Sequence, residues 1–132
     1  MRAERVLETC LYAADLDAAE RFYRDVLGME VESKMAGRHV FFRCGPGVFL
    51  VFNPEATRQA GGPVPGHGAT GPGHVAFAAS PEELPRWRAQ LARQAVPIEQ
   101  EVHWPGGGAS LYFRDPAGNS VELATPGIWG LG

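Results

Sequence analysis

The chain has few cysteines, little net charge and no long apolar stretch. Cys10 and Cys44 are its only cysteines, which excludes a disulfide framework and favours a reducing, cytoplasmic location. No apolar run reaches the roughly 20 residues of a membrane span, and residues 1–5 lack the apolar core of a signal peptide. A formal net charge of −3 gives no reason to expect nucleic acid or an anionic membrane as a partner.

Glycine and proline are abundant, and they gather between the apolar runs. The 17 glycines and 11 prolines concentrate in the segments 45–47, 61–73, 105–108 and 116–118, where they favour turns and loops. Hydrophobic residues make up 45% of the chain and charged residues 20%, as in an ordinary globular protein. At 132 residues the chain is long enough to bury one core.

The first half of the chain predicts one strand, one helix and three further strands. Alternation over 6–13 predicts a strand on which Glu8 and Cys10 share a face. Asp15 is a favourable helix N-cap, and apolar residues at helical spacing continue to a stop at Gly28. The other strands are expected over 29–33, 38–44 and 48–53.

The second half repeats this order after a stretch, residues 54–72, that is rich in Gly, Pro and small polar types. A strand over 74–79 precedes Ser80 and Glu83, which have the spacing of a capping box at the start of a helix. Residues 115–119 (DPAGN) are a strong turn signal. Strands are also expected over 97–103, 110–114 and 120–124.

Individual residues repeat as well as elements. Segment 40–43 (VFFR) aligns with 111–114 (LYFR), and segment 49–54 aligns with 121–126. Each module has one helix to cover one face of its sheet, so the other face must be covered by the second module. We therefore predict an α+β fold in which two tandem βαβββ modules form an open, cup-shaped barrel, a concave shape that favours small-molecule sites. The predicted parts are module one 5–54, a linker 55–72, module two 73–126 and a C-terminal tail 127–132.

Three polar residues lie at matching points of this repeat and suggest a divalent-metal site. Glu8 and His74 open equivalent strands, and Glu122 lies on the last strand of the second module. One imidazole and two carboxylates suit iron, manganese, nickel, cobalt or zinc. The alternative is structural, with a solvated Glu8, a hydrogen-bonded His74 and an edge-strand charge at Glu122.

The chain also resembles the vicinal oxygen chelate superfamily, which includes glyoxalase I, extradiol dioxygenases, and bleomycin and fosfomycin resistance proteins. The resemblance rests on Glu8 and residues 15–19 (DLDAA) in the first half, and on 73–77 (GHVAF) and 112–123 (YFRDPAGNSVEL) in the second. It extends over 6–126. It implies paired βαβββ modules, a homodimer, and one divalent metal ion on the inner faces of the sheets.

Carried over residue by residue, the family's metal ligands fall on Glu8, His74 and Glu122. The fourth ligand position falls on Leu50, which cannot ligate. Three ligands and an open position imply a catalytic metal, and hence a lyase, isomerase or dioxygenase acting on a small oxygen-chelating substrate. Glu122, Glu8 or His67 would then move a proton. The apolar Leu50 favours the alternative, a metal-free drug- or metabolite-binding protein of the bleomycin-resistance type.

The remaining candidates lie around the predicted cup. His67, in the Gly-rich segment 66–71, is either a metal ligand, proton shuttle or substrate contact, or an exposed loop histidine. The apolar tail is expected to dock. Candidates for substrate contact are Cys10, Tyr112, Trp104 and Trp129. His39 and His103 are expected at strand ends on the surface. Arg38, Arg43 and Arg114 either contact an anionic substrate or lie on a solvated outer sheet face, which is the usual place of arginine on a strand.

Overall fold

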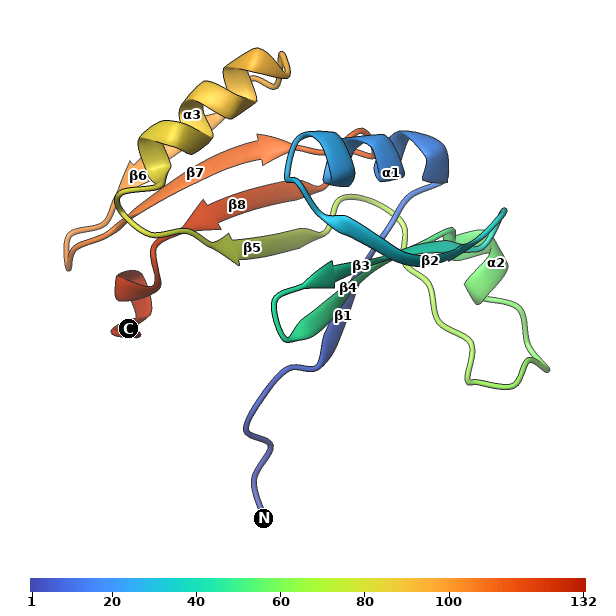
Figure 1. Cartoon of the computed structure of the whole chain (residues 1–132). Coiled ribbons are helices and arrows are strands. Elements are labelled where there is room, and N and C mark those ends of the chain that lie inside the picture. Colours follow the sequence, from blue (N-terminus) through green and yellow to red (C-terminus); the bar gives the residue numbers. More distant parts are fainter. The chain divides into compact units, whose positions relative to one another are not determined.

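The computed structural model describes residues 1–132, which divide into two compact units, Met1–Gly71 and Pro72–Gly132. Each unit contains the predicted order of one strand, one helix and three strands, and a four-stranded sheet (Figure 1). The fold is therefore the predicted tandem βαβββ arrangement with two open sheets. None of the helices has the length and hydrophobicity that crossing a membrane requires.

In the first unit the sheet has the strand order β1-β4-β3-β2. Strand β1 runs parallel to β4, and the other two neighbouring pairs are antiparallel. The elements of this unit are β1 (Glu8–Tyr12), α1 (Leu16–Asp25), β2 (Glu30–Met35), β3 (His39–Cys44), β4 (Gly47–Phe52) and α2 (Pro54–Thr57).

Helix α1 covers one face of this sheet. The carboxylate of Asp15 accepts a hydrogen bond from the Ala18 amide at 3.0 Å, which confirms the predicted N-cap. Tyr23 is fully buried, and its ring lies 5.6 Å from that of Phe42 and 4.9 Å from that of Phe49, centroid to centroid. Since side chains alternate along a strand, residues one position away from Phe42 and Phe49 lie on the opposite face.

That opposite face carries the residues on which the sequence analysis depends. The β1–β4 register pairs Glu8 with Val48 and Cys10 with Leu50. Leu50 is buried, while Glu8 is exposed and Cys10 half-buried. The centre of this face, around Leu50, is formed by Cys10 and Phe41, and polar side chains such as Glu8, Tyr12 and His39 lie towards its two ends.

In the second unit the sheet has the order β5-β8-β7-β6, again with a parallel first pair. Helix α3 lies over β6 and β7 in Figure 1. On the two inner strands, the apolar residues on the sheet face opposite to Glu122 are almost fully buried: Leu111, Phe113, Val121 and Leu123. The elements are β5 (His74–Ala78), α3 (Leu84–Arg93), β6 (Gln100–His103), β7 (Ala109–Arg114), β8 (Ser120–Ala124) and a 3-10 turn, η1 (Pro126–Trp129).

The start of α3 agrees only in part with the predicted capping box. The two reciprocal bonds are present: the Ser80 amide donates to Glu83 Oε2 at 2.8 Å, and the Glu83 amide donates to Ser80 Oγ at 3.2 Å. Residues 81–83 nevertheless form a turn, and the helix begins at Leu84. Pro85 has no N–H to bond the preceding turn, so regular helical bonding starts late.

The strand registers confirm the repeat alignment. In the second unit His74 pairs with Ser120 and Ala76 with Glu122. In the first unit Glu8 pairs with Val48 and Cys10 with Leu50 at the equivalent positions. Leu50 is therefore the counterpart of Glu122, as the sequence alignment predicts. One element was missed: residues 54–57, expected to belong to the end of a strand region and a linker, form α2, because the Asn53 side chain caps the Glu55 amide at 3.0 Å.

Candidate functional site

The predicted ligands of the second unit lie together on one sheet face. Nε2 of His74 and Oε1 of Glu122 are 3.2 Å apart. Strands β5 and β8 are parallel, and His74 lies opposite Ser120. Glu122 lies two residues further along β8 and therefore on the same sheet face. The Glu122 side chain is only 7% exposed, and that of His74 is 51% exposed. Since β8 is an inner strand, reading Glu122 as an edge-strand charge was wrong.

The hydrogen bond of the other imidazole nitrogen fixes the tautomer of His74. Nδ1 lies 3.0 Å from the carbonyl oxygen of Ser120, and a carbonyl only accepts, so Nδ1 carries the proton. In the neutral ring Nε2 is then a lone-pair acceptor, and it faces a carboxylate oxygen of Glu122. Two acceptors at this distance need a proton or a cation between them. A backbone carbonyl that orients a ligating imidazole is the usual arrangement at protein metal sites.

A chain of donors holds the second oxygen of Glu122. Ser110 Oγ donates to Glu122 Oε2 at 2.6 Å, and Trp104 Nε1 donates to Ser110 Oγ at 2.9 Å. Ser110 is fully buried and Trp104 is 39% exposed. Trp104, predicted as a substrate contact, is thus joined to the site through Ser110. Sequence reasoning missed Ser110, although the alternation of β7 puts it on the face of Tyr112.

Tyr112 completes this cluster. It pairs with Glu122 across β7 and β8, and its ring stacks on His74 with centroids 6.3 Å apart and planes at 24°. Burial, and then the negative charge of Glu122, raise the pKa of Tyr112 above its ordinary value. The phenol is therefore protonated at neutral pH, and it is suited to donate a hydrogen bond to a bound oxygen.

The turn before β8 positions His74. The amide of Gly73 donates to Asn119 Oδ1 at 2.7 Å, and Asn119 Nδ2 donates to Asp115 Oδ2 at 2.9 Å. Asp115 Oδ1 also accepts from the Ala117 and Asn119 amides. Asp115 and Asn119 are 5% and 2% exposed, so this network is shielded from water. It fixes the start of β5 immediately before His74.

In the first unit the structure brings His67 onto the sheet face that carries Glu8. His67 Nδ1 is 2.7 Å from the hydroxyl of Tyr12, and its ring meets that of Phe52 edge-on at 4.8 Å. His67 is half-buried, so the reading of an exposed loop histidine was wrong. Burial, and then the neighbouring Cys10 thiol, raise the pKa of Tyr12 above its ordinary value. Tyr12 was not among the predicted site residues.

Close packing of the loop backbone explains why glycines flank His67. The His67 amide donates to the carbonyl of Thr57 at 2.9 Å. A side chain at Gly68 would come within 2.7 Å of Arg58 Cγ, and one at Gly66 within 3.2 Å of the Arg58 carbonyl. The two glycines thus allow the loop to approach α2 and direct the imidazole to Tyr12.

His39 and Arg38 differ from the expectation of a solvated surface. Both are half-buried, and His39 stacks on Phe41 with centroids 3.9 Å apart. Arg38 Nη1 donates to His39 Nδ1 at 2.7 Å. Burial, and then the charge of Arg38, lower the pKa of His39 below its ordinary value. His39 and Arg38 thus pack on the rings of Phe41 and Phe52 rather than extending into solvent. The spacing of these residues in the sequence does not reveal such contacts.

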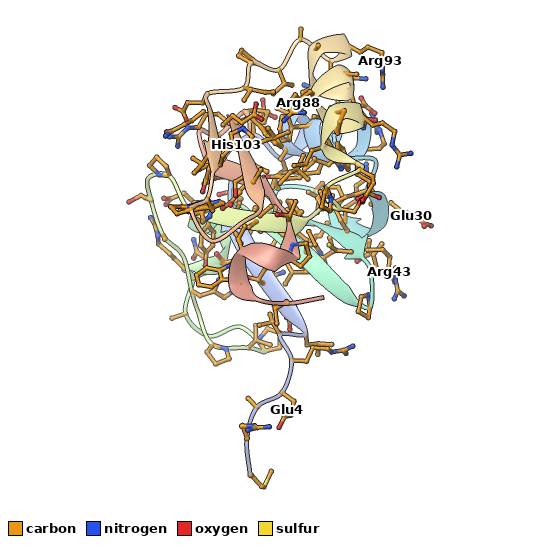
Figure 2. All side chains as sticks on the ribbon, turned by 90° about the vertical axis from the view of Figure 1, so that its left-hand side faces the viewer. Glu4, Glu30, Arg43, Arg88, Arg93 and His103 are labelled. Atoms are coloured by element: carbon orange, nitrogen blue, oxygen red, sulfur yellow. The ribbon has the colours of Figure 1, made fainter.

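The other predicted surface groups are exposed. Arg43 binds Glu32 with Nε and Oε2 2.5 Å apart, and Arg114 binds Glu99 at 3.0 Å. The His103 side chain is 76% exposed. In Figure 2 the Arg43 side chain extends away from the ribbon.

The C-terminal tail docks only in part. Ile128 lies against Gly108, where an added Cβ would meet Ile128 Cγ2 at 2.6 Å. Trp129, a predicted substrate contact, is 79% exposed.

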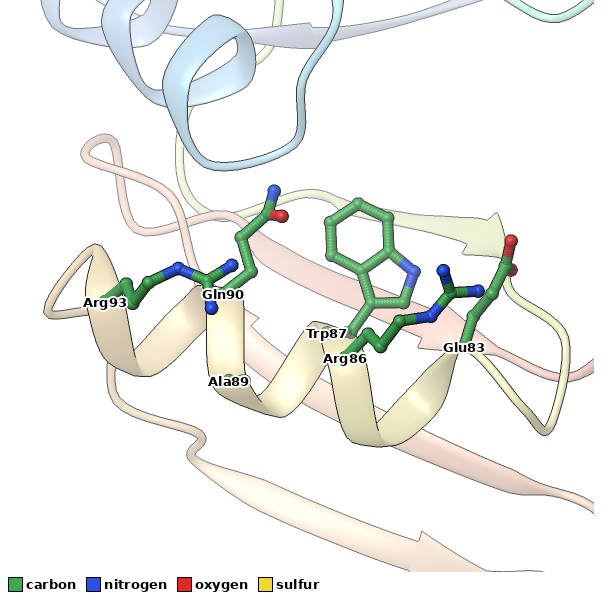
Figure 3. A pocket seen from close by; sticks show the side chains of 6 residues that line it. All are labelled: Glu83, Arg86, Trp87, Ala89, Gln90 and Arg93. Carbon is green, nitrogen blue, oxygen red and sulfur yellow. The ribbon is translucent and has the colours of Figure 1, made fainter.

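A separate hollow of about 390 Å³ lies along α3 and is lined by Glu83, Arg86, Trp87, Ala89, Gln90 and Arg93 (Figure 3). None of the site residues described above belongs to this hollow.

The complete three-ligand set stays a prediction. Glu8 belongs to the first unit, and His74 and Glu122 belong to the second. Within neither unit do three or more His, Cys, Asp or Glu side chains form a group that could hold a metal ion. The second unit thus brings two of the three predicted ligands, His74 and Glu122, into contact.

Comparison with known proteins places this geometry in a family. Residues 5–123 match the Glyoxalase/Bleomycin resistance protein/Dioxygenase superfamily. The chain belongs to this superfamily. It is similar to the crystal structure of a lactoylglutathione lyase from Agrobacterium tumefaciens, with 44% identity and a TM-score of 0.96 over 99% of this chain and 100% of the other. A search of curated protein sequences found no match.

More distant members of the superfamily share the fold. A glyoxalase/bleomycin resistance protein/dioxygenase from Nocardioides is 23% identical, with a TM-score of 0.75 over 95% of this chain and 85% of the other. A fosfomycin resistance protein from Listeria monocytogenes is 18% identical, with a TM-score of 0.70 over 94% and 91%. At these identities the likeness shows the fold alone.

Proposed function

We propose that this protein is a divalent-metal-dependent lyase or isomerase of the glyoxalase type, acting on a small substrate that presents two adjacent oxygens. The single observation that carries the proposal is the contact between His74 Nε2 and Glu122 Oε1 at 3.2 Å, with the Nδ1 proton of His74 directed to a backbone carbonyl. The 44% identity to a lactoylglutathione lyase supports the same chemistry.

His74, Glu122 and Glu8 would hold the metal, with iron, manganese, nickel, cobalt or zinc as candidates. The donor set fits such an ion, because the imidazole already has its proton on Nδ1 and the carboxylate already has one oxygen bound by Ser110. In the repeat alignment the family's fourth ligand falls on Leu50, which cannot ligate, so the proposed metal would keep an open coordination position for substrate oxygens. A bound divalent ion would act there as a Lewis acid on those oxygens.

The two carboxylates have different tasks in this proposal. Glu122 is buried and accepts a 2.6 Å hydrogen bond from Ser110, which holds the carboxylate in one orientation and suits it to ligation. Glu8 is exposed and is the better candidate to take a proton from substrate carbon. Tyr12 and His67 lie on the sheet face of Glu8 and contact each other at 2.7 Å, and His67 stays the candidate for moving a proton at the other end of β1.

The functional test is an assay for lactoylglutathione formation from the hemithioacetal of methylglyoxal and glutathione, with protein reloaded separately with each candidate ion. Glu8→Gln leaves His74 and Glu122 as metal ligands, so metal-dependent turnover that is lost in this variant while its metal content stays that of the wild type would support Glu8 as the base. Turnover unchanged by that variant would remove Glu8 from the mechanism.

A second candidate function is a metal-free protein that binds a small drug or metabolite. Leu50 favours it, since it lies buried beside Cys10 where a ligand residue would be needed. So do the rings of Phe41 and Phe52 on the same sheet face, 5.4 Å apart and edge-on. Failure to bind any of the five metals would favour this function.

We also propose, as the family resemblance implies, that the protein is a homodimer. Its other binding partner would be the small-molecule substrate. Sedimentation equilibrium measures the assembly directly. A mass of twice 14.2 kDa supports the dimer, and a monomer at micromolar concentration rejects it.

A further inference from the structure

The first unit contains a cavity that the proposed metal chemistry does not fill and that has His67 at one edge. Its volume is about 270 Å³, slightly below the range of pockets that hold drug-sized ligands. It lies between α2, the loop that follows it, and the residue before β3. Its walls are Arg38, Ala56, Thr57, Gln59, Ala60, Gly61, Gly62, Pro63, Val64, Pro65 and His67.

Arg38 gives this cavity a positive charge that no carboxylate neutralises. Arg38 is a half-buried residue, and it belongs to none of the ion pairs of the chain. Its Nη1 donates to His39, and its Cζ lies 5.4 Å from the centre of the Phe52 ring. His39 is a neutral acceptor here, because burial and the adjacent guanidinium disfavour its protonation. A half-buried cation with only neutral neighbours favours an anionic ligand.

The walls of the cavity are held in place by the backbone. The Asn53 amide donates to the carbonyl of Arg38 at 2.8 Å, and the Asn53 side chain caps α2. At the far end of the loop, the His67 amide binds the Thr57 carbonyl at 2.9 Å. Backbone hydrogen bonds thus anchor the lining segments at Arg38 and at His67, the two ends of the cavity wall in the sequence.

We propose that this cavity binds a small monocarboxylate with a short apolar body. The carboxylate would lie on the Arg38 guanidinium, which matches its planar geometry, and the body would lie against Ala60, Pro63 and Val64. One positive charge and mainly apolar walls suit a singly charged carboxylate better than a phosphate dianion. The site lies wholly in the first unit and needs no metal, so it stands or falls independently of the proposed enzyme.

The test is calorimetric titration of the full-length, metal-free protein with benzoate, with benzamide as the neutral probe of the same shape and inorganic phosphate as the alternative anion. Benzoate should bind, and benzamide should bind at least about tenfold more weakly, because it lacks the charge-assisted bonds to Arg38. Chemical shifts of the imidazoles of His39 and His67 should move with benzoate, which locates the ligand.

Two variants make the result specific. Arg38→Gln should weaken benzoate at least about tenfold, whereas Arg21→Gln, which removes an exposed arginine of the same unit, should leave the affinity unchanged. Val64→Glu places a negative charge at a residue that is 55% exposed, cannot disturb the core, and should also abolish binding. Equal binding of benzoate and benzamide, wild-type affinity in both cavity variants, tighter binding of phosphate than of benzoate, or no benzoate binding at all would each overturn the proposal.

Discussion

Removing the hydroxyl of Ser110 should reveal how strongly Glu122 is held. In Ser110→Ala, Glu122 Oε2 loses its 2.6 Å donor in a place where the carboxylate is only 7% exposed. A charge-assisted hydrogen bond contributes about 1.5–3 kcal/mol. Trp104 also loses its acceptor, but it is 39% exposed, so water can replace most of that bond.

The expected loss is therefore about 2–3 kcal/mol of unfolding free energy, or a Tm lower by roughly 6–15 °C for a domain of this size. Urea denaturation of metal-free protein measures it. Trp104→Phe is the matched control, since it keeps the bond between Ser110 and Glu122 and should cost less than about 1 kcal/mol. If Ser110→Ala is as stable as the wild type, the hydrogen-bond chain does not hold Glu122 as described.

Three further results are expected. Asn119→Ala removes the acceptor of the Gly73 amide and one donor to Asp115 Oδ2, and should lower the free energy of unfolding by about 2–4 kcal/mol. Hydrogen exchange along β5 should become faster, and unchanged exchange there would refute the positioning role. Because the folded-state pKa of His39 is lowered, its contribution to stability is present above the unfolded pKa of about 6.5 and is lost as pH falls towards the folded value; His39→Phe should flatten the acid side of a Tm-against-pH curve, and an unaltered curve would contradict this. Glu122→Gln removes a cause of the raised pKa of Tyr112, so a spectrophotometric titration should show one phenol ionising at lower pH than in the wild type; three superimposable tyrosine titrations would argue against the contact.

The fold was predictable because local signals and the repeat agree. Alternation fixed which face of β1 carries Glu8, and the Asp15 carboxylate marked the start of α1. Alignment of the two halves placed Leu50 opposite Glu122, and the strand registers confirm it. These features depend on residues that are close in sequence or repeated within it, so single-sequence reasoning reaches them.

The parts that escaped prediction depend on contacts between distant residues. Tyr12 and His67 are 55 positions apart, and nothing in either segment specifies the partner. Ser110 was overlooked because a lone serine on a strand has no distinctive spacing. The inward position of Arg38 follows from the rings of β3 and β4. His74 and Glu122 are far apart in the chain, and they were assigned to one site from their places in the repeat and from the family resemblance, not from local spacing.

The central claim is that His74 and Glu122 ligate a divalent metal. The measurement that tests it most directly is the metal content, by plasma mass spectrometry, of protein purified without chelator or nickel affinity resin, compared with folded Glu122→Gln. The proposed site predicts close to one iron, manganese, nickel, cobalt or zinc ion per wild-type chain, and loss of that ion in the variant. Full occupancy in Glu122→Gln, or no metal in the wild type even after reloading with each ion, would contradict it.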